Sequence, residues 1–105
     1  IKVQWKHDFQ DEPTLLYSEL DSKRNEIRKV EVYRNDKLGY ACENKSVNGT
    51  FLSKTEIPSL EDINEDIQFV ACEIDKEYFE SLLRKNNLIS KNNSNGKVII
   101  QYKDN

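Results

Sequence analysis

Four short runs of alternating apolar and polar residues, separated by polar turns, occupy the first 43 residues and limit the fold more than any other feature. The runs cover residues 2–9, 14–20, 26–34 and 38–43. Such alternation is typical of β-strands, because successive side chains point to opposite faces of a sheet. Since the turns between the runs are short, we expect an antiparallel meander.

The rest of the chain mixes strand and helix signals. Residues 44–49 have the composition of a loop, whereas 50–57 and 68–74 are rich in strand-forming residues. Residues 58–66 predict a short helix with Ser59 as N-cap, and Asp75 can cap a longer helix that ends near residue 86. Four apolar residues lie on one side of that helix and should dock on the sheet, namely Tyr78, Phe79, Leu82 and Leu83.

These elements predict a single α+β domain over residues 1–105. We expect an antiparallel meander of five to six strands, with one main helix and one short helix on a face. Residues 86–105 form an atypical, Asn-rich tail in which 97–102 could add an edge strand. No apolar run approaches the roughly 20 residues that span a bilayer, and no signal peptide is visible. We therefore expect a cytoplasmic protein.

His7, the only histidine, lies on the apolar side of the first run together with Trp5. Histidine is the commonest general base, but catalysis also needs a nucleophile or an orienting carboxylate nearby. We favour a structural imidazole that is hydrogen-bonded to a carboxylate or to a backbone carbonyl. The alternative is a small cytoplasmic enzyme or ligand-binding domain with a site around His7, Glu12, Glu19 and Arg28.

The sequence lacks the motifs of common catalytic, metal and cofactor sites. Its three glycines lie far apart, so no phosphate-binding loop is present, and neither an EF-hand nor GxSxG or HExxH occurs. Cys42 and Cys72 do not form a CxxC pair, and we expect two reduced, buried thiols. Asp11 and Glu12 could act as an acid–base pair or bind a metal, but adjacent acids in a turn are more often solvated. We expect neither an enzyme nor a cofactor or metal.

The run at 26–34 carries charges on both of its faces. Cross-strand ion pairs with Glu19 or Glu43 would explain them. Alternatively, a polar and aromatic binding face would contain Tyr17, Arg28, Tyr33 and Arg34. We favour the ion pairs.

Negative charge is concentrated in one part of the chain. The formal net charge is −3, but residues 56–80 contain nine acidic residues and one lysine. Such a block repels phosphate backbones, which argues against a nucleic-acid-binding protein. It would attract a basic protein and speed the encounter with it. The alternative is a solvated helix face with acids at helix N-termini.

Residues 2–41 resemble a small bacterial domain of unknown function. Its members show W-x-H, D-E-P, L-Y-S-E-L-D, R-x-E-x-R-K-V-E and a G-Y-A hairpin return. In this chain the motifs are Trp5 and His7, Asp11 to Pro13, Leu16 to Asp21, Arg24 with Glu26 and Arg28 to Glu31, and Gly39 to Ala41. Residues 57–80 are similar as well, so the likeness covers about residues 1–84, and residues 86–105 depart from it.

Small acidic domains of this kind look like immunity proteins of bacterial toxin–immunity systems, including contact-dependent growth inhibition. The resemblance implies an inhibitor that binds the C-terminal domain of a cognate toxin, often a basic nuclease, and occludes its active site. Neither nucleic acid nor a membrane is an expected partner. The residues expected to contact the toxin are Glu61, Asp62, Glu65, Asp66, Glu77 and Glu80.

Overall fold

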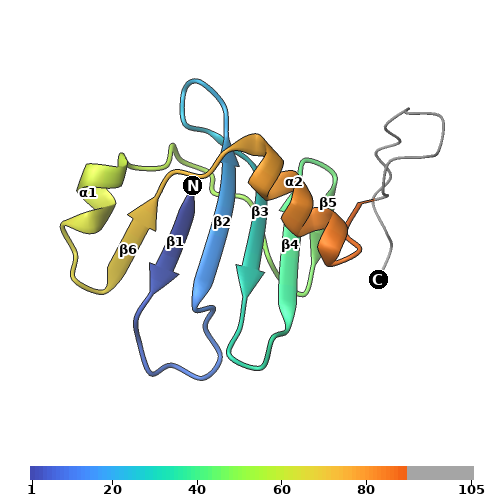
Figure 1. Ribbon diagram of the computed structural model, residues 1–105, viewed down its shortest axis with the longest axis horizontal. Coiled ribbons are helices and arrows are strands. Elements are labelled where there is room, and N and C mark those ends of the chain that lie inside the picture. The colour runs from blue at the N-terminus through green and yellow to red at the C-terminus, as the bar shows by residue number, and fades with distance from the viewer. Residues whose placement is uncertain (90–105) are drawn as a thin grey trace. The chain divides into compact units, whose positions relative to one another are not determined.

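The computed structural model describes residues 1–89, which belong to two compact units (Figure 1). The first unit, residues 1–74, contains six strands and helix α1. Its elements are β1 (Lys2–Trp5), β2 (Leu15–Leu20), β3 (Glu26–Val32), β4 (Leu38–Cys42), β5 (Lys45–Val47), α1 (Leu60–Asn64) and β6 (Phe69–Cys72). The second unit begins at Asp75 and contains the longer helix α2 (Lys76–Lys85). The predicted α+β class, with one short and one main helix, is confirmed.

The six strands lie in the order β5-β4-β3-β2-β1-β6, and every neighbouring pair is antiparallel. The first five strands form the predicted meander. The chain then leaves β5 at one edge of the sheet and returns to pair β6 with β1 at the other edge (Figure 1). The connection between these edges, residues 48–68, holds the irregular segment and the helix that border the candidate site.

Strand β1 is shorter than predicted, because it ends at Trp5 rather than at Phe9. The backbone N–H of Trp5 still bonds to Thr14 O at 2.9 Å, but β2 begins only at Leu15. The N–H of Lys6 still bonds to Gln68 O at 2.7 Å, but residues 6–14 belong to no strand and form a loop. The prediction that His7 and Phe9 belong to the strand is therefore wrong.

Residues 50–58, which we call the strap, form no strand, so the prediction of a strand at 50–57 is also wrong. The fifth strand lies instead at Lys45–Val47, inside the predicted loop. Asn48 and Gly49 have φ angles of 56° and 76°, and these left-handed residues turn the chain out of the sheet. The strap backbone is then held by side chains of the sheet rather than by a neighbouring strand.

Thr50 fixes the beginning of the strap. Its side chain is fully buried, and its hydroxyl donates to Glu31 Oε1 at 2.7 Å. A Cβ atom built on Gly39 would lie 1.8 Å from Thr50 Oγ1, so only glycine leaves room for this contact. Gly39 and Glu31 are register partners on β4 and β3, which places Thr50 directly on this face of the sheet.

The face of the sheet opposite to Thr50 carries a row of buried side chains in the first unit. Register partners share a face, and one such row crosses four strands. Its members are buried: Tyr17, Val30, Tyr40 and Val47. This apolar row stabilises the meander, since the free energy of folding scales with the apolar area removed from water.

The charges of β3 are satisfied within the sheet. Arg28 forms a two-pronged ion pair with its register partner Glu19, with N–O distances of 2.6 and 2.9 Å. The predicted cross-strand pair is thus confirmed. Tyr17 and Arg28 are both buried, at 6% and 8% exposure, so the alternative exposed face of arginines and tyrosines is not formed by these residues.

A register shift at the end of β2 turns Glu26 toward the strap. Glu19 pairs with Arg28 and Leu20 pairs with Glu26, so Ile27 is an extra residue and is 42% exposed. Because of this bulge, the Glu26 carboxylate accepts from Ser18 Oγ at 2.6 Å and from the N–H of Ser53 at 2.8 Å. The bulge therefore places a buried carboxylate between the sheet and the strap.

Both helices begin at the predicted caps. Ser59 Oγ accepts from the N–H of Asp62 at 3.1 Å, and Asp75 Oδ1 accepts from the N–H of Tyr78 at 2.7 Å. In α2, Phe79 and Leu83 are buried. The docking of α2 on the sheet stays a prediction, and the proposed edge strand at 97–102 lies outside the described residues.

Both cysteines are free thiols. Cys42 is buried, as expected, but Cys72 is exposed, so the prediction of two buried thiols is wrong for Cys72. The reason is the position of Cys72 at the end of β6, which is an edge strand.

Candidate binding site

Four of the six predicted contact residues lie together on α1 and the turn after it. We call Glu61, Asp62, Glu65 and Asp66 the acidic surface. All four are exposed, and among the described residues none of their carboxylates takes part in an ion pair. The last turn of α1 contains no basic residue. Within residues 1–89, the acidic surface is therefore a patch of carboxylates without ion-pair partners.

The helix dipole explains only half of these acids. Glu61 and Asp62 lie in the first turn of α1, where the helix dipole favours negative charge. Glu65 is the C-cap residue and Asp66 follows it, so both lie at the end where negative charge is disfavoured. Stability of α1 alone therefore gives no reason for acids at these two positions.

The two remaining predicted residues belong to the second unit and are described separately. Glu77 is exposed and pairs with Arg84 at 3.2 Å. Glu80 is half-buried and is not without an interaction partner. The acidic surface of the first unit is thus the part of the prediction that the structure gathers into one patch.

A cavity of about 340 Å³ opens beside the acidic surface, between the sheet, the end of the strap and α1. Asp62 and Asp66 are among its lining residues, whereas Glu61 and Glu65 are not. Most of its wall is apolar, formed by Val3, Leu16, Ile57, Pro58, Ile63 and Phe69. We call this cavity the α1 cleft. Its size is at the lower end of the range for ligand pockets.

Glu26 and Lys29 also line the α1 cleft, and they compensate each other. Lys29 Nζ lies 3.7 Å from Glu26 Oε1, and the Glu26 side chain is only 1% exposed. The amino group of Ile1 donates to Ser18 O at 2.7 Å, and burial, followed by the charge of Arg24, lowers its pKa. Asp62 and Asp66 are therefore the carboxylates at this cleft that have no cationic partner among the described residues.

Arg24 anchors the part of the strap that forms one wall of the α1 cleft. Its Nε donates to Ile57 O at 2.8 Å, and its second terminal nitrogen donates to Pro58 O at 2.5 Å. The N–H of Ile57 returns a bond to Arg24 O at 2.8 Å. Three bonds from one residue therefore fix the strap where Ile57 and Pro58 border the cleft.

His7 has both ring nitrogens engaged with the loop after β1. Nε2 donates to Pro13 O at 2.7 Å, and Nδ1 accepts the N–H of Phe9 at 2.9 Å. The ring centroid of His7 also lies 4.2 Å from that of Trp5. These contacts agree with the structural interpretation, in which a backbone carbonyl satisfies the imidazole.

The residues of the alternative enzyme site do not come together. His7 and Glu12 lie in the loop before β2, whereas Glu19 and its partner Arg28 lie near the other end of that strand. Glu19 lies four strand positions beyond Leu15, which corresponds to about 13 Å. The structure therefore offers no single site that contains all four.

A polar hollow of about 280 Å³ near the same loop contains Asp11 and Tyr33. Burial raises the pKa of the Tyr33 hydroxyl, with added contributions from Glu31 and Glu12. Glu12 itself is exposed. Within residues 1–89, no group of three or more His, Cys, Asp or Glu side chains is arranged to hold a metal ion.

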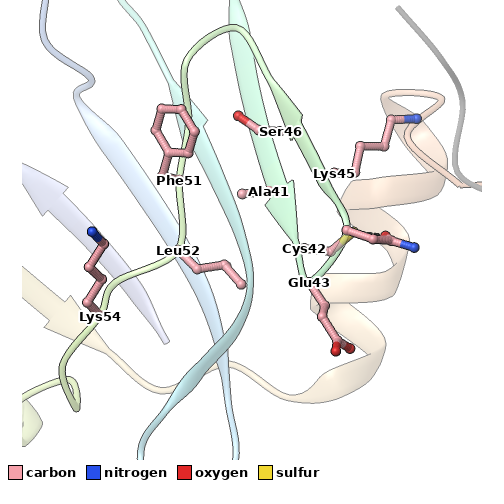
Figure 2. A pocket seen from close by; sticks show the side chains of 9 residues that line it. Ala41, Cys42, Glu43, Lys45, Ser46, Phe51, Leu52 and Lys54 are labelled. Carbon is pink, nitrogen blue, oxygen red and sulfur yellow. Dashed lines mark hydrogen bonds between the residues drawn. The ribbon is translucent and has the colours of Figure 1, made fainter.

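A larger hollow, of about 800 Å³, lies between the strap and the hairpin of β4 and β5 (Figure 2). Phe51, Leu52 and Lys54 border it from the strap, and Ala41 and Ser46 border it from the hairpin. Its charged residues, Glu43, Lys45 and Lys54, have both signs. It thus lacks the pair of carboxylates without a described cationic partner that borders the α1 cleft.

A family model described as Domain of unknown function (DUF6881) matches residues 1–88. The chain belongs to this family. No curated protein and no solved structure matches the chain. The DUF6881 match includes the acidic surface, the strap and the α1 cleft, and it ends at residue 88, near the start of the Asn-rich tail. In the described part of the chain, no helix is long and apolar enough to cross a membrane.

Sequence reasoning missed the α1 cleft of this DUF6881 domain. Alternation along a regular strand assigns Glu26 and Lys29 to opposite faces, and only the bulge at Ile27 lets them meet. The signal that could have indicated the cleft was Glu26, an acid at the start of a β-branched run and directly after the turn at 21–25. The acidic surface, in contrast, was visible as a run of charges.

Proposed function

We propose that this DUF6881 domain is an immunity protein that acts in the cytoplasm and neutralises a cognate bacterial toxin domain. The toxin is a basic nuclease, and the domain inhibits it by occluding its substrate groove rather than by catalysis. The acidic surface pairs with cationic residues that otherwise bind the phosphate backbone of the substrate. Electrostatic complementarity of this kind speeds association and selects the partner.

The observation that carries this proposal is the uncompensated charge of the acidic surface. Four exposed carboxylates lie within six residues, and none is neutralised by a described basic residue. Two of them, Glu65 and Asp66, occupy positions that the dipole of α1 disfavours, so the helix dipole does not account for them. A basic partner would supply the missing positive charge.

The first test is co-expression with the C-terminal domain encoded by the reading frame just upstream. We expect that domain to be toxic alone, and we expect this chain to relieve the toxicity and to co-purify with it. A harmless upstream product, or undiminished killing without a complex, would refute the proposal.

The second test reverses charge within the acidic surface. For Asp62→Lys combined with Glu65→Lys, we expect association with the toxin to slow by about tenfold at low salt and to lose most of its salt dependence. Stopped-flow or surface plasmon resonance measurements over a range of salt concentrations would follow both effects.

The matched control is Asp8→Lys combined with Glu43→Lys, which changes the net charge by the same amount at two other exposed positions. We expect this variant to associate nearly as fast as the parent chain. Equal slowing in both double variants would mean that net charge alone matters and would argue against a defined acidic surface.

A further inference from the structure

We propose that the α1 cleft receives a lysine side chain of the protein partner, with the aliphatic stem inside the cavity and the ammonium group at Asp62 and Asp66. This inference rests on the proposed function and deepens it, because it names a residue that the partner must present. It also separates the acidic surface into a pair of acids that hold this lysine and a pair that only attracts the partner.

The shape and lining of the cleft fit the stem. The cavity of about 340 Å³ is walled by aliphatic and aromatic side chains that include Val3, Leu16 and Ile63. Lysine buries its four-carbon stem along apolar surface while its charged end stays at a polar boundary. The cavity has room for this stem and for part of an apolar neighbour.

The charges around the cleft select a cation. Glu26 already accepts hydrogen bonds from Ser18 and Ser53 and lies next to Lys29, so the buried charges are compensated. Asp66 Oδ1 accepts from the N–H of Gln68 at 2.9 Å, which positions this carboxylate. Asp62 and Asp66 thus present negative charge beside an apolar cavity, and a compact ammonium group complements both features.

The chain supplies its own matched comparison. Asp62 and Asp66 are four residues apart and line the cleft, whereas Glu61 and Glu65 are four residues apart on the same segment and do not. Asp62→Asn with Asp66→Asn removes two charges at the cleft. Glu61→Gln with Glu65→Gln removes two charges from the same surface outside the cleft. Both variants keep side chains of nearly the same size, and an amide spectrum shows directly whether each is folded.

The first arm uses n-butylammonium, which has the same carbon stem and charged group as a lysine side chain. In amide NMR spectra we expect it to shift the signals of Val3, Leu16 and Ile63. We expect millimolar affinity, because a ligand of about five non-hydrogen atoms can supply only a small binding free energy. The double variant with Asp62→Asn and Asp66→Asn (the Asn pair) should weaken this binding at least fivefold. The double variant with Glu61→Gln and Glu65→Gln (the Gln pair) should leave it nearly unchanged. The neutral alcohol n-butanol should bind more weakly. No shifts at the cleft, or equal effects of both pairs, would overturn the inference.

The second arm measures dissociation of the toxin complex. We expect the Asn pair and the cavity-filling change Ile63→Phe to accelerate dissociation at least tenfold, and the Gln pair to affect mainly association. If both pairs alter only association to the same degree, the cleft inference fails while the proposed function stands. If n-butylammonium enters the cleft but no toxin domain binds, the proposed function and the assignment of a partner lysine both fail.

Discussion

At the scale of single residues, Gly39 shows how one missing side chain shapes the fold. Thr50 occupies the space that a Cβ atom would need, and its hydroxyl bonds to Glu31. Because the two segments are far apart in sequence, this contact fixes where the strap begins. Glycine is required here by close approach of a neighbour, since Gly39 itself has no left-handed φ angle.

We predict that Gly39→Ala destabilises the domain by about 1–3 kcal/mol, since the added methyl group forces Thr50 away from the sheet. Urea unfolding measures this loss. In a Thr50→Ala background the same change should cost much less, because the clashing hydroxyl is gone. Strictly additive effects of the two substitutions would show that the clash is not the cause.

Asp21 is the residue for which we predict an effect of pH. Hydrogen bonds from the backbone N–H of Asn25, its side-chain amide and the N–H of Lys23 hold the pKa of this exposed carboxyl below its usual value of 3.8. The folded state therefore favours the ionised form. Its stabilising effect is present above the unfolded pKa and is lost as the pH falls through the folded pKa.

We therefore predict that Asp21→Ala lowers the urea midpoint at neutral pH. The difference from the parent chain should shrink as the pH falls below the usual carboxyl value, because protonated Asp21 has also lost these charge-assisted bonds. Asp8→Ala serves as the control, since the described structure gives its exposed side chain no hydrogen bond. A difference that grows toward acid pH would contradict the prediction.

At the scale of elements, α1 protects the open edge of β6. Asn64 Nδ2 donates to Ala71 O at 3.0 Å, and Asn64 Oδ1 accepts the N–H of Ala71 at 2.7 Å. One side-chain amide thus satisfies both backbone groups of Ala71, which a further strand could otherwise use. Edge strands need such protection because unpaired backbone groups recruit other chains.

We predict that Asn64→Ala costs about 1–2 kcal/mol of stability, from the loss of two hydrogen bonds. The exposed edge should also promote self-association at high concentration. Urea unfolding and sedimentation velocity measure the two effects. Gln68→Ala, a change at an exposed residue of the same turn, should be close to neutral. A monomeric variant of unchanged stability would show that Asn64 does not protect the edge.

The elements also show which sequence signals were reliable. The meander and the two helix caps followed from local patterns, because alternation and capping act between residues close in sequence. The strap was mistaken for a strand because residues 50–57 have strand composition. Its course depends instead on Gly39, Glu26 and Arg24, whose contacts with it span 11 to 34 residues of sequence.

At the scale of the whole molecule, charge and cavity have different origins. The acidic surface is a property of six consecutive positions and is visible in the order of the residues alone. The α1 cleft exists only because β6 returns to β1 and the strap crosses to reach it. Both features occur in the same small region, and this coincidence is why we infer a binding function.

Local patterns along the chain were enough to establish the α+β class, the four-strand start of the meander, both helix caps and the acidic surface, since each depends on neighbouring residues. The end of β1 at Trp5, the position of β5 and the placing of Glu26 on the strap face emerged only from the folded chain. The same holds for the separation of His7, which lies in the loop after β1, from Arg28, which lies on β3. These features depend on which distant backbone groups find partners, and a bulge of one residue reverses the side to which a strand residue points.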